Sequence, residues 1–158
     1  MQEIQFGRKY HDVITGFEGI AIGFTEYLSG CTQVLLAPQV VADGAKKESH
    51  WFDIQRIKPA GDATLITLDN SGIPQRQPRV QLGKKYREKF TMFEGIAVGR
   101  AEYIAGNTEV LIAPRVGHDG ENRVSEWYPE IHLDELSDNA AVLDNKKNPG
   151  CDRAAPKR

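Results

Sequence analysis

Hydrophobic residues alternate with smaller or polar ones along Glu18–Leu28 (EGIAIGFTEYL). A period of two is typical of a β-strand, because successive side chains point to opposite faces. After the turn dipeptide Ser29-Gly30, the apolar run Thr32–Ala37 (TQVLLA) predicts a second, shorter strand. Three further elements complete the predicted order: a strand at Ser49–Phe52, one tight helical turn at Asp53–Arg56 and a last strand from Ile57.

The same pattern occurs twice in the chain. Phe6–Ala60 aligns with Leu82–Leu136 without a gap, at an offset of 82 − 6 = 76 positions. The stretch FEGIA is identical in both copies, as Phe17–Ala21 and Phe93–Ala97. Further identities include Gly7/Gly83, Tyr10/Tyr86, Gly23/Gly99, Tyr27/Tyr103, Val34-Leu35/Val110-Leu111, Ala37-Pro38/Ala113-Pro114 and Trp51/Trp127. Self-similarity at a fixed offset indicates two copies of one module.

Short strands separated by turn signals favour a small closed or half-closed barrel for each copy. Closure is expected because open strand edges on so small a module invite aggregation. We therefore predict an all-β protein with two tandem five-stranded barrels, at residues 1–60 and 82–136. A linker with a β-prone segment (61–81) joins them, and a trailing segment with an extended basic tail (137–158) follows.

The segments outside the barrels suggest self-association. Ala63–Asn70 (ATLITLDN) is β-prone and could add a strand to a barrel edge, its own or a neighbour's; Ala140–Asn145 is its counterpart. Exchanged edge strands are a route to homo-oligomers. The terminal KKNPGCDRAAPKR lacks apolar periodicity, so we expect it to be mobile unless a partner holds it.

The order of elements resembles the Src-homology-3-like small barrel, including its KOW-type variant. The resemblance lies in GFEGIAIGFTEYL and MFEGIAVGRAEYI, in the long loop, and in the WFDIQRI-type ending, and it covers Phe6–Ala60 and Leu82–Leu136. The sequence pattern GFEGIA…EYL.GC.QVL..P…WFD is also similar to that of a family of small uncharacterised bacteriophage proteins. That second resemblance implies a phage or prophage origin and brings no activity with it.

The resemblance to small barrels implies an aromatic-lined groove in which proline-rich or extended segments dock. The candidate binding residues are the recurring Tyr27/Tyr103 and Trp51/Trp127, although these side chains could instead fill the core. Phe17/Phe93 favour the core, with Gly19/Gly95 making the corner into the long strand. FEGIA is therefore interpreted as a structural element of the barrel and not as a binding site. Recognition is expected where the copies differ, as at Phe24 against Arg100, which adds Arg100 to the candidates.

Charge is unevenly distributed. Pro74–Phe90 holds six Lys/Arg against one Glu, a balance of 6 − 1 = +5, whereas Gly117–Asp144 has a balance of 1 − 8 = −7. The basic stretch could contact phosphates or could be a solvated linker, and the acidic stretch could face a basic partner. The candidate nucleic-acid contacts are Arg76, Arg79, Lys84 and Lys85. The formal net charge of −2 weighs against a dedicated nucleic-acid binder.

The sequence offers no nucleophile motif, phosphate-cradling loop or metal-ligand spacing, so we predict no enzyme, no catalytic residue, no metal and no cofactor. The two cysteines, Cys31 and Cys151, are sparse enough to suggest reduced thiols. No apolar run is long enough to span a bilayer, and the first residues lack a signal-type apolar segment. We expect a cytoplasmic protein, in the host cell if phage-encoded, or else a virion protein.

Three functions follow as hypotheses. The first is a non-catalytic adaptor or inhibitor that engages a host or phage macromolecule, most simply a protein, through barrel grooves and a charged flank. The second is a KOW-like nucleic-acid accessory protein. The third is an oligomeric virion component or a protein that sequesters a nucleotide. We favour the first hypothesis.

Overall fold

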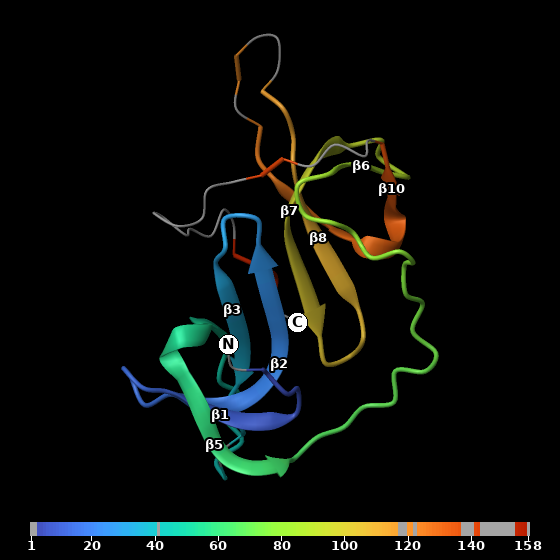
Figure 1. The fold of residues 1–158 in the computed structure, drawn as a ribbon. Coiled ribbons are helices and arrows are strands. Elements are labelled where there is room, and N and C mark those ends of the chain that lie inside the picture. The colour runs from blue at the N-terminus through green and yellow to red at the C-terminus, as the bar shows by residue number, and fades with distance from the viewer. Residues whose placement is uncertain are drawn as a thin grey trace.

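Ten β-strands and two short 3-10 turns make up the regular structure of the described residues (Figure 1). The computed structural model describes residues 3–40, 42–116, 120–121, 123–136, 141–142 and 154–157. The all-β prediction is confirmed for this part of the chain. In the same residues, no helix is long and apolar enough to cross a bilayer.

The first repeat forms five antiparallel strands in the order β5-β1-β2-β3-β4. Their bounds are β1 (Arg8–Asp12), β2 (Glu18–Tyr27), β3 (Thr32–Ala37), β4 (His50–Asp53), the turn η1 (Ile54–Arg56) and β5 (Ile57–Thr64). The predicted long strand, apolar strand, helical turn and last strand are all confirmed. Strand β4 begins one residue later than the sequence predicts.

The second repeat has the same order, β10-β6-β7-β8-β9. Its elements are β6 (Lys85–Glu88), β7 (Glu94–Tyr103), β8 (Thr108–Ala113), β9 (Glu126–Pro129), the turn η2 (Glu130–His132) and β10 (Leu133–Glu135). The duplicated sequence therefore produces a duplicated arrangement of strands.

The two repeats meet where β2 pairs antiparallel with β7 (Figure 1). In this pairing Thr25 faces Ala101, and these residues are equivalent because 25 + 76 = 101. A pairing centred on two equivalent residues has the symmetry of a two-fold dimer inside one chain. The Thr25 hydroxyl also donates a hydrogen bond to the Arg100 carbonyl across the junction, at 3.2 Å.

The prediction of two tandem barrels, each closed or half-closed, is not confirmed. All ten strands form one sheet, and that sheet is open. A register shift between Ala21 and Gly23 divides β2, and an equivalent shift between Ala97 and Gly99 divides β7. Along one edge, the first half of each long strand pairs with the first strand of its own repeat, and the second half pairs with the long strand of the other repeat. The other edge pairs with the third strand of the same repeat, β3 or β8. The pairing between repeats therefore covers a strand edge of each repeat that would be exposed in an isolated open sheet.

Each repeat has its own apolar core, built around a fully buried tyrosine. Tyr10 lies with Ala21, Val34, Leu36, Phe52, Ile54 and Ile57, whereas Tyr86 lies with Val80, Ala97, Val110, Ile112 and Leu133. The Tyr10 hydroxyl accepts a hydrogen bond from the backbone N–H of Gln5 at 3.0 Å, and the Tyr86 hydroxyl accepts one from Gln81 at 2.9 Å. These bonds satisfy the polar tips of the buried rings. The two tyrosines, and not Phe17 and Trp51, are the largest fully buried side chains.

The glycines of FEGIA are needed for a different reason from the one the sequence suggested. Neither Gly19 nor Gly95 has a positive φ. A Cβ atom at Gly19 would lie 2.8 Å from the Ala37 carbonyl oxygen, and one at Gly95 would lie 2.2 Å from the Ala113 carbonyl oxygen. Real Cβ atoms do not approach backbone so closely, so these positions require glycine because neighbouring strands pass directly over them.

The β-prone segment Ala63–Asn70 adds little to the sheet. Strand β5 ends at Thr64, and the Leu65 N–H then donates to the Gly7 carbonyl at 2.8 Å. Ala141 donates to Gly83 in the equivalent way at 2.7 Å. The chain crosses to the second repeat, where the Asn70 side-chain amide donates to the Ile104 carbonyl at 2.9 Å. Residues 143–153, which include most of the predicted trailing strand and tail, lie outside the described residues.

Candidate functional site

Four recurring aromatic residues meet at the junction of the two repeats. Trp51 packs edge-on against Tyr103, with ring centroids 6.4 Å apart, and Trp127 packs edge-on against Tyr27 at 6.2 Å. Each pair takes its tryptophan from one repeat and its tyrosine from the other. We call Tyr27, Trp51, Tyr103 and Trp127 the junction cluster.

Glycine in the long strands makes room for this cluster. A Cβ at Gly23 would lie 3.2 Å from both Trp51 and Tyr103, and one at Gly99 would lie 3.0 Å from Tyr27. The rings therefore lie directly on the backbone of the long strands. This contact accounts for the identity of Gly23 and Gly99 in the two copies, because a larger residue would push the aromatic side chains away.

Residues 154–157 of the same chain lie against the junction cluster. The Trp51 indole N–H donates to the Ala155 carbonyl at 2.7 Å, and the Trp127 indole N–H donates to the Ala154 carbonyl at 3.2 Å. The Tyr103 hydroxyl donates to the Pro156 carbonyl at 2.7 Å. Three aromatic side chains thus recognise three consecutive main-chain carbonyls.

Ala155 is the residue at the centre of this contact. It is 4% exposed and belongs to an apolar cluster with Leu35, Ala101 and Tyr103. Beyond it, Lys157 lies 3.7 Å from the Glu48 carboxylate. The sequence predicted a mobile tail, but these four residues are held by the body of the protein, because the indole and hydroxyl donors find their acceptors there.

Arg100 is almost completely buried in the second repeat, and its role in recognition stays a prediction. It is 4% exposed, and its guanidinium donates to both Glu130 carboxylate oxygens at 2.9 Å. Glu130 also accepts hydrogen bonds from the Val80 N–H and the Thr108 hydroxyl, each at 2.8 Å. Burial alone would raise the pKa of the Glu130 carboxyl, but the hydrogen bonds from Arg100, Val80 and Thr108 together hold its pKa below the ordinary value.

The predicted basic contacts are each engaged within the protein. Arg79 pairs with Glu102 at 2.6 Å, Lys84 pairs with Glu135 at 3.0 Å, and Lys85 pairs with Glu94 at 3.0 Å. Arg76 donates to the Leu133 carbonyl at 3.0 Å and lies over the Tyr86 ring.

The basic and acidic stretches are neighbours in space, because β10 pairs with β6. Part of the charge imbalance seen along the sequence is therefore cancelled between adjacent strands. Nothing here places a nucleic acid on these side chains, so that contact stays a prediction.

Cys31 is disulfide-bonded, which contradicts the expectation of reduced cysteines. The only other cysteine of the sequence is Cys151, which lies outside the described residues. The cellular compartment stays a prediction. Within the described part of the chain, no group of three or more His, Cys, Asp or Glu side chains is arranged to hold a metal ion.

Comparison of the chain with protein families, with curated proteins and with solved structures finds no match. The all-β architecture is compatible with a small barrel-like domain, whereas the resemblances to Src-homology-3-like barrels and to phage proteins rest on the sequence motifs alone.

The four aromatic residues recur in the sequence and could be identified from it, but their contacts could not. The docked segment, Ala154–Lys157, has no repeat equivalent and no apolar period that would mark it. Glu130 was also missed, although one signal was present. At the offset of 76, Phe24 is replaced by Arg100 and Ile54 by Glu130, so an apolar pair becomes a charge pair. Paired replacements of this kind point to spatial contact.

Proposed function

We propose that the protein is a non-catalytic, Src-homology-3-like binding protein whose junction cluster takes an extended, proline-containing segment of a partner protein. The observation that carries the proposal is the set of three aromatic side-chain donors on consecutive carbonyls of Ala154–Pro156. Main-chain recognition of an extended segment on an aromatic surface is the physical basis of several peptide-binding modules.

The chain's own Ala154–Lys157 acts in this proposal as a self-ligand that shows which chemistry the junction cluster accepts. The central residue must be small, since Ala155 is 4% exposed among Leu35 and Ala101. Proline at the next position favours the extended backbone, which lowers the entropy lost on docking. A partner segment with a small residue before proline satisfies both requirements.

An adaptor or inhibitor role agrees with this chemistry. The resemblance of the sequence to phage proteins suggests a host protein as the partner. The basic stretch gives less support to nucleic-acid binding, because each of the four candidate cations has a carboxylate or carbonyl partner in the protein.

The test is a peptide titration on a variant whose own segment has been displaced. Ala155→Arg places a large charged side chain where almost no exposed surface exists, and should release residues 154–157. We expect this variant to bind the peptide DRAAPKR (residues 152–158) with one-to-one stoichiometry by calorimetry, whereas the unmodified protein should bind it far more weakly.

Two controls accompany the titration. Lys157→Ala removes only an exposed ion pair, so this protein should behave like the unmodified one. A peptide carrying arginine in place of the second alanine should not bind. Absence of saturable binding of DRAAPKR to a folded Ala155→Arg protein would show that the segment is only a structural part of the chain.

A further inference from the structure

Each repeat contains a hollow, and the two hollows occupy equivalent places. One has a volume of about 390 Å³ in the first repeat, and the other about 320 Å³ in the second. Both lie between the turn that joins the first two strands and the long connection after the third. The equivalent lining residues are Lys9/Lys85, Gly16/Met92, Phe17/Phe93, Glu18/Glu94, Gly19/Gly95, Pro38/Pro114, Gln39/Arg115 and Lys47/Arg123. FEGIA thus lines a pocket in both copies, although its glycine serves strand packing.

Most of the shared lining has a structural explanation. Phe17 and Phe93 pack against their respective cores, and the glycines allow close strand approach. The carboxylates are neutralised by neighbours on the adjacent strand. Glu18 pairs with Lys9 at 2.5 Å, and Glu94 pairs with Lys85 at 3.0 Å. These residues alone do not indicate a ligand.

The rim cations have no such explanation. Lys47 and Arg123 lie on irregular, exposed connections, and nothing in the backbone requires a basic residue there. Among the described residues, no ion pair joins either side chain, or Arg115, to a carboxylate. Both copies nevertheless place a cation at this position beside the pocket.

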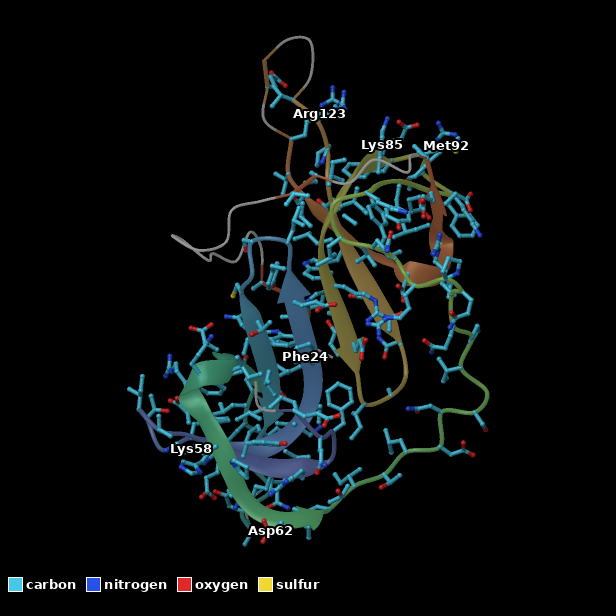
Figure 2. All side chains as sticks on the ribbon, in the orientation of Figure 1. Phe24, Lys58, Asp62, Lys85, Met92 and Arg123 are labelled. Atoms are coloured by element: carbon cyan, nitrogen blue, oxygen red, sulfur yellow. The ribbon has the colours of Figure 1, made fainter. Side chains whose placement is uncertain are left out.

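The balance of charge around the hollows is positive. The lining of the second pocket holds Lys85, Arg115 and Arg123 against Glu94, so 3 − 1 = +2. The lining of the first holds Lys9 and Lys47 against Glu18, so 2 − 1 = +1. Figure 2 shows Lys85, Met92 and Arg123 gathered at one end of the second repeat. The whole chain carries −2, so these positive pockets are local features and not a consequence of overall charge.

We propose that the two pockets are twin binding sites for a small oxyanion ligand, one that carries phosphate or carboxylate groups. The forked guanidinium groups of Arg115 and Arg123 suit such groups, because they donate two parallel hydrogen bonds to oxyanions. The aromatic wall of Phe93 offers an apolar surface for the rest of the ligand. The second pocket, with the greater positive charge, binds more tightly than the first. This activity is separate from the junction cluster, so either proposal can fail without the other.

The test is calorimetric titration of the full chain at low salt with two probes, inorganic pyrophosphate and citrate. They distinguish phosphate from carboxylate as the source of the oxyanion. We expect two sites of unequal affinity for at least one probe, with binding weakened by added salt. Arg115→Gln and Arg123→Gln should each weaken the tighter site by about tenfold or more, since a hydrogen bond to a charged group is lost. Lys47→Gln should affect only the weaker site.

Lys58→Gln is the matched control, because it removes one exposed positive charge from β5, outside the lining of both pockets (Figure 2). Its affinities should equal those of the unmodified protein. The proposal is overturned if neither probe binds saturably at low salt, or if Lys58→Gln weakens binding as much as Arg123→Gln. Backbone amide shifts confined to residues that line neither pocket would overturn it as well.

Discussion

The two repeats fill one equivalent corner of the fold with different side chains, which are apolar in the first repeat and charged in the second. In the first repeat, Phe24 and Ile4 pack against an apolar core that includes Ile54. In the second, the equivalent positions hold Arg100, Glu130 and Val80, since each lies 76 residues further on. There a buried guanidinium and carboxylate bond each other, and the carboxylate also holds the Val80 N–H.

The difference teaches that the strand order does not depend on which kind of contact fills this corner. The two repeats should differ in how much stability they lose when a residue at this corner is substituted. An apolar contact loses energy in proportion to the atoms removed. A buried ion pair that loses one partner leaves an uncompensated charge, which costs much more than the net contribution of the intact pair. The second repeat should therefore be the more easily broken of the two.

Glu130→Ala is expected to have the largest effect. Arg100, which is 4% exposed in the intact protein, would keep only Glu102 as an ion-pair partner, and the Val80 N–H would lose its acceptor. We expect a loss of about 3–5 kcal/mol in the free energy of unfolding, measured by urea denaturation. Glu3→Ala, at an exposed position, is the control and should change stability little. A loss as small as that of the control would contradict the structural role of the pair.

The double variant Arg100→Phe with Glu130→Ile converts the second corner to the chemistry of the first. Replacing a buried pair by apolar residues is often neutral or stabilising by about 1–4 kcal/mol. Here the unpaired Val80 N–H offsets part of that gain, at a cost of about 1–3 kcal/mol. We therefore expect unfolding free energy within about 2 kcal/mol of the unmodified protein, and much above that of Glu130→Ala. A double variant as unstable as the single one would mean that the corners are not interchangeable.

A smaller contrast concerns two equivalent carboxylates, Asp12 and Glu88, each at the end of the first strand of its repeat. Hydrogen bonds from Arg56 lower the pKa of Asp12 well below its usual range, whereas hydrogen bonds from Thr91 lower the pKa of Glu88. A lowered pKa in the folded state stabilises the protein above the unfolded-state pKa of about 4, and this stabilisation is lost as the pH falls toward the folded value.

Asp12→Asn should therefore flatten the dependence of the melting temperature on pH below about 4, and it should do so more than Glu88→Gln. The reason is that Asp12 is 0% exposed and receives two hydrogen bonds from Arg56, at 2.7 and 3.0 Å. Circular dichroism melts at several pH values measure the slope. Equal slopes for the unmodified protein and Asp12→Asn would contradict the assignment, and Glu3→Gln serves as the exposed reference.

The succession of strands along the chain could be predicted from the sequence because it rests on local patterns. Alternation along Glu18–Tyr27 and the apolar run Thr32–Ala37 are visible within one segment. The open ten-stranded sheet could not be predicted in the same way, since it depends on β2 pairing with β7 across the repeats. For the same reason Tyr27 and Trp127 were separate candidates in the sequence, and only the fold brings them together at 6.2 Å.

The central claim, that the junction cluster recognises an extended segment, can be measured directly. The chain has two tryptophans, and both indole N–H groups donate to carbonyls of Ala154 and Ala155. In the NMR spectrum of the unmodified protein, both indole protons should exchange slowly with solvent. In Ala155→Arg they should shift and exchange faster, and saturating DRAAPKR should restore slow exchange. Indole proton shifts and exchange rates that change with neither the substitution nor the peptide would contradict recognition by the junction cluster.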